Sequence, residues 1–156
     1  MQLLIKNVQL ESGFVYENQR IVGTQTQLKD IFIEDGKFKQ IKDNIDVKEV
    51  ETVNAQGQLL LPSLKEMHVH IDKTYFGAEW SAGEEMVDGI FTRLKEERTM
   101  LPDMLKNAEN LTHNMIRYYI SKGHTHIRTH VNVDPTIGLQ HMEKTKRVLD
   151  YYKDQI

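Results

Sequence analysis

The sequence contains no cysteine, and this absence excludes several kinds of chemistry at once. A disulfide framework, a catalytic thiol and a thiolate-ligated metal site all need cysteine. A metal ion would have to be held by histidine and carboxylate side chains, and the chain has seven histidines. Motifs of the forms G-x-S-x-G, G-x-x-x-x-G-K-[ST] and G-x-G-x-x-G are also missing, which excludes the serine-hydrolase, P-loop and dinucleotide-binding classes.

Long apolar runs and an excess of basic charge are missing too. The amino-terminal segment lacks the apolar core of a signal peptide, and the aliphatic run at 59–61 is far shorter than the roughly 18 residues of a membrane-spanning helix. Twenty Lys and Arg against 23 Asp and Glu give a net charge of −3. This mild acidity gives no reason to expect nucleic acid or a membrane as partner. A cytoplasmic globular protein is the expectation.

Residues 1–62 are predicted to form short strands of antiparallel style. Apolar and polar residues alternate from the start, and Asp35-Gly36 between the apolar segments 31–33 and 38–41 predicts a hairpin. Further strands are expected at 50–53 and 58–61. The polar segment 17–29 is interpreted as a loop.

After Pro62 the pattern predicts a β–α–α–β–α order, which is typical of parallel strands with right-handed crossovers. The expected elements are a strand at 64–71, a helix opened by the capping-box spacing of 81–84, a helix at 102–122 that starts at Pro102, a strand at 124–133 and a helix at 135–153. The inner face of that last helix is predicted to carry Leu139, Met142, Leu149 and Tyr152. Because a (β/α)₈ barrel needs about 200 residues or more, residues 63–156 are interpreted as the opening of a larger fold.

His68 and His70 are the first candidates for chemistry. On a strand, residues i and i+2 point to the same face, so both imidazoles could reach one metal ion at about 2.0–2.1 Å. Asp72 extends this face by one more step. An isolated H-x-H often arises by chance, and two surface histidines are the alternative interpretation. The pair follows an apolar strand, however, and α/β barrels place their chemistry at the carboxyl ends of strands.

The strand at 124–133 carries further candidates, because His124, His126, Arg128 and His130 share one of its faces. His130 is nearest the carboxyl end and is the candidate for lining a site. His124 and His126 are expected to bond to water or backbone instead.

Other polar and aromatic residues receive simpler interpretations. Trp80 and Tyr75 follow the histidine pair and could form a pocket wall, although packing is their commoner role. The histidines at 113 and 141 and the paired glutamates at 84–85 and 96–97 are expected to be solvated on helices.

Residues 61–74, LPSLKEMHVHIDKT, resemble the amidohydrolase superfamily and within it most closely the cytosine deaminase-like branch. The segments 80–83, 88–90 and 128–131 resemble that branch in the same order. The resemblance covers nearly all of this chain but only about the first third of the family's length. Ser63 stands where many members carry glycine, and Lys73 occurs in only some of the branch.

The resemblance implies a fold class: α/β, the start of a TIM (β/α)₈ barrel at 63–156, preceded by part of a small β-sandwich at 1–62. It implies that His68 and His70 are ligands of a divalent metal, zinc or iron. The acid–base Glu and the water-orienting Asp of the family have no counterpart up to Ile156, so no residue here is assigned as catalytic. The candidate substrate-binding residues are Asp72, Lys73, Trp80 and His130.

The implied activity is metal-dependent hydrolysis of a carbon–nitrogen bond in a cyclic amidine or amide, such as a pyrimidine. One alternative is a non-catalytic remnant or an interaction subunit that pairs with a complementing chain. Another is an unrelated α+β binding module with incidental histidines. With two ligands and unpaired sheet edges, the 156-residue chain alone is expected to bind metal weakly, to lack activity and to self-associate.

Overall fold

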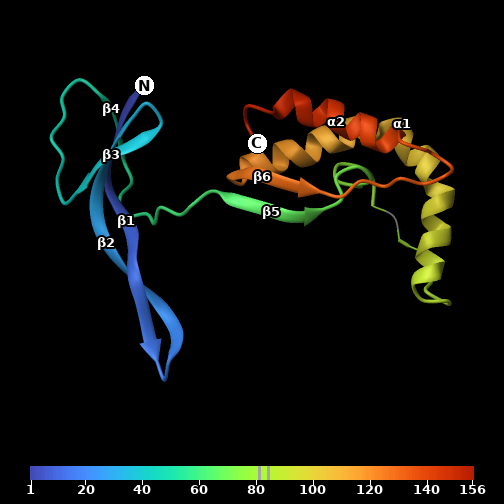
Figure 1. Cartoon of the computed structure of the whole chain (residues 1–156), viewed down its shortest axis with the longest axis horizontal. Helices are drawn as coiled ribbons and strands as arrows, with labels where there is room; N and C mark the ends of the chain where they lie inside the picture. Colours follow the sequence, from blue (N-terminus) through green and yellow to red (C-terminus); the bar gives the residue numbers. More distant parts are fainter. Residues whose placement is uncertain (81, 84) are drawn as a thin grey trace. The chain divides into compact units, whose positions relative to one another are not determined.

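The computed structural model describes residues 1–80, 82, 83 and 85–156, and the chain divides into two compact units, Met1–Pro62 and Ser63–Ile156. In the part of the chain that the structure describes, the first unit is built of strands and the second of two strands and two helices (Figure 1). The fold is therefore mixed α/β. No helix among the described residues is both long and apolar enough to cross a membrane.

The first unit is one sheet with the strand order β3-β2-β1-β4. Its strands are β1 (Gln2–Glu17), β2 (Arg20–Glu34), β3 (Lys37–Lys42) and β4 (Glu51–Asn54). The hairpin predicted at Asp35-Gly36 is confirmed, because β2 and β3 pair antiparallel with Ile31 opposite Ile41. Asp35 and Gly36 have φ values of 52° and 71°, as a tight hairpin turn requires.

Three expectations for this unit are wrong. The segment 58–61 is not a strand, since it forms only an isolated bridge between Leu59 and Gln9. Residues 17–29 are not a loop, since β2 begins at Arg20 and pairs with β1 along nearly its whole length, which makes both strands long. Asn18 and Gln19 form the turn, with φ values of 48° and 64°. Most side chains in the outer half of this hairpin are exposed, so no apolar alternation marks it as a strand. The pairing of β4 with β1 is also parallel rather than antiparallel.

A buried carboxylate, Asp30, holds the small core of this unit in register. The core contains Leu4, Phe32 and Ile45. Oδ1 of Asp30 accepts the backbone N–H of Asn7 at 3.0 Å, and Oδ2 accepts that of Ile45 at 3.1 Å. Asp30 therefore fixes both the irregular point of β1 and the loop that closes the core.

We predict that Asp30→Ala lowers the free energy of unfolding of this unit by about 2–4 kcal/mol, because it leaves two backbone N–H groups without their acceptor. Amide exchange of Asn7 and Ile45 should accelerate. The matched control is Asp43→Ala, since Asp43 is exposed and contacts only the Lys29 side chain by ion pairing, which should change stability by less than about 1 kcal/mol. Equal effects of the two substitutions in chemical denaturation would contradict the assignment.

The second unit pairs its two strands in parallel, as the sequence predicts. Its elements are β5 (Leu64–Val69), α1 (Ile90–Ser121), β6 (His124–Thr129) and α2 (Gln140–Tyr152). Gly123 has a φ of 82° just after α1, which is the left-handed residue expected past a helix end. The chain thus returns from α1 directly into β6.

The two helices expected between these strands are one helix. Pro102 lies inside α1 rather than at a start, and Figure 1 shows the helix changing direction along its length. A proline removes one backbone hydrogen bond and bends a helix without always ending it. The capping box expected at 81–84 rests on Ser81 and Glu84, which lie outside the described residues; the helix itself begins at Ile90.

The last helix begins at Gln140, later than the Asp134-Pro135 pair predicts. Asp134 instead closes a turn: its carboxylate accepts the N–H of Thr136 at 2.8 Å, and its carbonyl accepts that of Gly138 at 2.7 Å. Of the predicted inner face, Leu149 and Tyr152 do lie at the core, whereas Leu139 and Met142 are exposed. The buried residues of α2 are His141, Thr145, Val148 and Tyr152.

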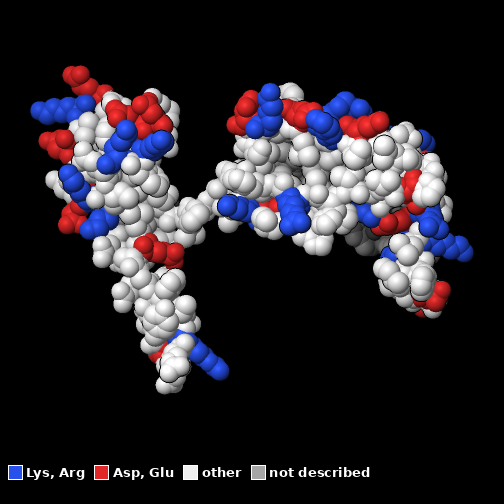
Figure 2. Space-filling model, in the orientation of Figure 1, with Lys and Arg blue, Asp and Glu red and all other residues white. Residues whose placement is uncertain are grey.

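Both helices contribute to the core of the second unit. Ile116 and Tyr119 of α1 meet Val148 and Tyr152 of α2 around the buried Ile71. Figure 2 shows charged side chains of the second unit along the outer side of α2, and further ones over the strands and the start of α1. Because Val69 and Ile71 belong to or pack against this core, the segment at the carboxyl end of β5 is supported by the two helices.

Candidate metal centre

Three histidines come together where the two parallel strands end. His68 lies near the end of β5, His70 directly follows that strand, and His130 directly follows β6. The ring centres are 4.6 Å apart for His68 and His130, 5.3 Å for His70 and His130, and 5.9 Å for His68 and His70. The structure thus brings His130 beside the predicted pair.

Two threonine hydroxyls, of the partly buried Thr129 and the buried Thr112, fix the backbone that carries this cluster. Thr129 Oγ1 donates to the carbonyl of Val69 at 3.1 Å and lies 3.2 Å from the N–H of Ile71. Thr112 of α1 donates to the carbonyl of Ile71 at 2.8 Å. The N–H of His130 also donates to Val69 O at 2.8 Å, so the two strand ends are joined directly. The chain around His70 is therefore held on both sides.

The donor chemistry of the cluster suits a divalent metal, but a closed site is not formed. Imidazoles bound to one tetrahedral ion at about 2.0–2.1 Å have ring centres about 5 Å apart, which matches the separations seen here. In the described residues, however, no three His, Asp or Glu side chains are arranged so that they could hold an ion. His68 and His70, with His130 beside them, are the residues that could supply ligands, and further ligands would be needed.

The surroundings of His70 favour its neutral form. Burial lowers the pKa of His70 below its ordinary value, and the positive charge of Lys73 lowers it further, whereas Asp72 acts in the opposite direction. Nδ1 of His70 lies 3.9 Å from Oδ1 of Asp72. A metal ion binds the neutral imidazole, so the direction of this pKa shift favours ligation.

Asp72 is the deepest polar residue of the site, because its side chain has no exposed surface. Its Oδ2 accepts the backbone N–H of Asn132 at 2.7 Å, which ties the segment after β5 to the segment after β6. Asp72 therefore contacts the site from behind the histidines rather than from an open face.

A cavity of about 390 Å³ adjoins His70 and contains an ion pair. Lys73 Nζ lies 2.7 Å from Glu97 Oε1, and both residues line the cavity with Tyr75. Glu97 was expected on a solvated helix face; the structure pairs it with Lys73 instead. No local pattern marks Glu97, because its partner is 24 residues away and the bend of α1 is not encoded in any periodicity.

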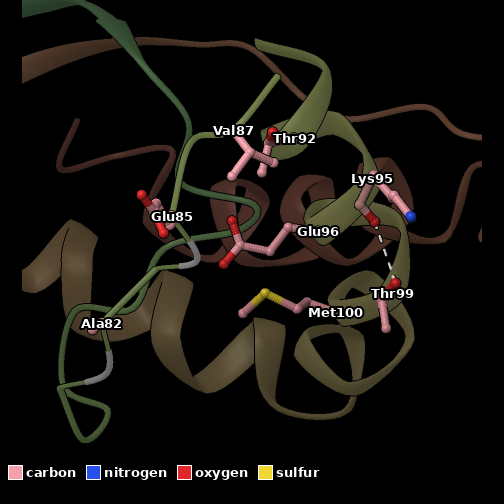
Figure 3. A pocket seen from close by; sticks show the side chains of 8 residues that line it. All are labelled: Ala82, Glu85, Val87, Thr92, Lys95, Glu96, Thr99 and Met100. Carbon is pink, nitrogen blue, oxygen red and sulfur yellow. Dashed lines mark hydrogen bonds between the residues drawn. The ribbon is translucent and has the colours of Figure 1, made fainter. Parts of the chain in front are cut away.

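The two aromatic candidates separate. Tyr75 lines the cavity beside His70, whereas Trp80 has 87% of its surface exposed. A larger cavity of about 650 Å³ lies at the start of α1, between Glu85 and Val87 on one side and Thr92, Lys95 and Thr99 on the other (Figure 3). It contains none of the clustered histidines and is not the place of the predicted chemistry.

The remaining histidines lie outside the cluster. His124 packs its ring on Tyr119 and places Nδ1 3.2 Å from the Tyr119 carbonyl, so it bonds to backbone as expected. His126 Nδ1 lies 2.9 Å from Thr125 Oγ1. His113 is half-buried with Nδ1 3.1 Å from the Tyr152 hydroxyl. The expectation that His141 is solvated is wrong: it is completely buried, with Nδ1 3.6 Å from Asp72 Oδ2.

Comparison with known proteins finds relatives over nearly the whole chain, although no family model matches it. The protein named "Uncharacterized protein YahJ" of Escherichia coli (strain K12) is 34% identical over 148 residues, which are 93% of this chain and 32% of that protein. A dihydroorotase of Aquifex aeolicus (strain VF5) is 28% identical over 156 residues, 97% of this chain and 33% of that enzyme. The chain spans about a third of the length of the relatives it matches.

Solved structures of related enzymes are also similar to this chain over nearly its whole length. N-isopropylammelide isopropylaminohydrolase from Burkholderia multivorans is 26% identical, with a TM-score of 0.77 over 99% of this chain and 35% of that one. Atrazine chlorohydrolase from Arthrobacter aurescens, complexed with zinc, shares the fold at 14% identity, with a TM-score of 0.61 over 97% of this chain and 34% of that one.

The chain thus shares a mixed α/β fold with these enzymes. The dihydroorotase and N-isopropylammelide amidohydrolase homologues are all members of the amidohydrolase superfamily, and the chain matches their amino-terminal part. The resemblance to that superfamily seen in residues 61–74 is confirmed.

We predict that Thr112→Val, which keeps the shape of the side chain, lowers the free energy of unfolding of the second unit by about 1–2 kcal/mol, because the buried Ile71 carbonyl loses its donor. The exchange of backbone amides from His70 to Asp72 should accelerate. Thr99→Val is the matched control on the same helix, since the exposed Thr99 only bonds to the Lys95 carbonyl. It should change stability by less than about 0.5 kcal/mol. A neutral Thr112→Val would show that the hydroxyl does not hold this segment.

Proposed function

We propose that this chain carries the metal-ligating part of a hydrolase that cleaves a carbon–nitrogen bond in a cyclic amide or amidine, such as a pyrimidine. The observation that supports this proposal best is the approach of His68, His70 and His130 at the carboxyl ends of two parallel strands. That edge is where α/β barrels carry their chemistry. The names of the dihydroorotase and N-isopropylammelide homologues support the same reaction class.

In this proposal His68 and His70 hold a divalent ion, zinc or iron. When bound, such an ion would lower the pKa of a water molecule, so that hydroxide is available at neutral pH to attack the carbon of the carbon–nitrogen bond. The zinc in the fold relative from Arthrobacter aurescens supports the choice of metal class. The neutral state of His70, favoured by burial and by Lys73, keeps a ring nitrogen available as a ligand.

The substrate would lie in the cavity beside His70. Its wall offers an ammonium group from Lys73 and a carboxylate from Glu97, a donor and an acceptor that complement the C=O and N–H groups on the edge of a ring amide. Tyr75 provides an aromatic face. His130 would face the substrate beside His68 and His70, because its ring lies next to theirs. Trp80 is exposed and would contact a substrate only from the loop after β5. Asp72 contributes through His70 because it is buried.

We further propose that residues 63–156 are the first two units of a TIM barrel and that residues 1–62 are strands of the accompanying small β-sandwich. The TM-score to the Burkholderia multivorans enzyme supports this interpretation. The cytosine deaminase-like branch, a small-molecule substrate and a cytoplasmic location remain predictions. The acid–base Glu and water-orienting Asp of the family are not assigned to any residue of this chain.

We predict weak binding of Co²⁺ or Zn²⁺ by the 156-residue chain, at one ion per chain, because no three side chains of the described residues are arranged to hold an ion together, whereas a closed site needs three or four protein ligands. Isothermal titration should show that His68→Ala and His70→Ala abolish the binding. His126→Ala is the matched control, since His126 is exposed on β6 and lies outside the cluster. Equal binding in all variants would refute the site.

The same preparations give a readout on catalysis. Cytosine hydrolysis by the chain alone should be unmeasurable, because each acid–base group typically contributes about 10²–10⁴-fold to the rate. Turnover that His70→Ala abolishes would show that the residues needed for catalysis are all in this chain.

A second candidate function is that of an interaction subunit, and one observation favours it. The sheet of the second unit has only β5 and β6 in the described part of the chain, so each strand has an outer edge without a strand partner. Leu64 and Met67 of β5 are about half exposed. Unpaired edges and exposed apolar side chains drive association.

We therefore expect the chain to self-associate at micromolar concentration unless a complementing chain covers β5 and β6. Sedimentation velocity over a range of concentrations would measure this, with thermal unfolding in parallel. A monodisperse monomer with a sharp cooperative transition would show that these edges do not drive association.

A further inference from the structure

Two titratable side chains, Asp72 and His141, meet in the interior of the second unit. The proposed function gives Asp72 a role through His70 but assigns none to His141. Asp72 follows β5 and His141 lies in the first turn of α2, and neither side chain has any exposed surface. Nδ1 of His141 lies 3.6 Å from Oδ2 of Asp72. This contact joins α2 to the segment that carries the candidate metal ligands.

The hydrogen bonding of this pair is incomplete. Oδ2 of Asp72 accepts the N–H of Asn132, but Oδ1 of Asp72 and both ring nitrogens of His141 have no hydrogen-bond partner in the described structure. Buried polar atoms without partners are rare and destabilising, so their presence in a folded protein needs an explanation. Packing alone does not supply one, because an apolar side chain at position 141 would fill the space without this penalty.

One of these atoms without a partner faces a second histidine, on the other side of Asp72. Its unpaired Oδ1 is the oxygen that lies 3.9 Å from Nδ1 of His70. Asp72 thus stands between the two imidazoles of His70 and His141, with one oxygen toward each. A carboxylate beside Nδ1 favours the tautomer that carries the proton there, and this leaves Nε2 of His70 free as a ligand.

We propose that Asp72 and His141 are a buried positioning pair, in which His141 holds the Asp72 carboxylate against His70 and so selects the His70 tautomer that can bind a metal through Nε2. This inference rests on the proposed function for its purpose, but the tautomer itself can be observed without metal. Neither residue touches the substrate cavity or the metal in this proposal.

The decisive measurement is long-range ¹H–¹⁵N NMR of the histidine rings in the metal-free 156-residue chain at pH 8. In the wild-type chain His70 should carry its proton on Nδ1. In Asp72→Asn the amide oxygen is needed to accept the N–H of Asn132, so the amide NH2 group faces Nδ1 of His70 and the signal should move to the Nε2-protonated form. In His141→Gln the change should be in the same direction and smaller. Val148→Ala is the control: Val148 is equally buried on α2, so this variant lowers the melting temperature but leaves the His70 tautomer unchanged.

Metal affinity gives a second readout. Asp72→Asn should weaken Zn²⁺ binding by about 10–100-fold, the usual effect of losing a carboxylate behind a ligating histidine. The double variant should be no weaker than Asp72→Asn alone, because His141 acts through Asp72. A wild-type His70 protonated on Nε2, or a tautomer unchanged in a folded Asp72→Asn protein, would overturn the positioning pair. The expected tautomers in a chain that binds no Zn²⁺ would uphold the pair and refute the metal site.

Discussion

The parallel pairing of β5 with β6 is the constraint on which the candidate site depends. It places the end of β5 beside the end of β6, although the two strands are separated by the whole of α1. His130 donates its N–H to the Val69 carbonyl at that point, so the histidines after the two strands become neighbours. A different register would carry His130 away from His68 and His70 while leaving the helices and their core largely intact.

Buried polar groups hold the irregular segments of both units in place. Asp30 accepts two backbone N–H groups in the first unit. In the second unit Asp72 accepts the N–H of Asn132, and Thr112 donates to the carbonyl of Ile71. Apolar packing is nondirectional and tolerates small shifts of a loop, whereas a hydrogen bond in a medium of low dielectric specifies one position. The backbone that carries His70 is therefore positioned by polar contacts, with the apolar core as their support.

What could be predicted from the sequence follows local rules. The Asp35-Gly36 hairpin, the glycine after α1 and the H-x-H pair at a strand end each depend on a few adjacent residues. The outer part of β2 was missed because an exposed strand shows no apolar alternation. In α2 the expected inner face is right at Leu149 and Tyr152, which lie at the core. It is wrong at Leu139 and Met142, because the buried positions in the first turns of the helix are taken by the polar residues His141 and Thr145. Pro102 predicts a helix start, but it lies inside α1, because a proline can be accommodated within a helix that bends.

The candidate site shows the same division. His68 and His70 are adjacent in sequence and could be found from their spacing, and His130 from its place at the end of the next strand. The partners of Lys73 and Asp72 could not, because Glu97 and His141 approach them only after α1 bends and α2 docks. Contacts of this kind arise from tertiary packing, and no periodicity of the sequence encodes them.

The long hairpin of β1 and β2 has a consequence for the way the first unit opens. β3 and β4 pair only with the inner ends of these strands, so the outer half of the ribbon is bonded to itself alone. Two strands without a third or a covering helix are barely stable in water. The outer ribbon should therefore unzip from its Asn18-Gln19 turn in fluctuations that leave the core around Leu4 and Phe32 folded. This makes the turn the natural point for limited proteolysis, and equally the place where an inserted peptide would be tolerated.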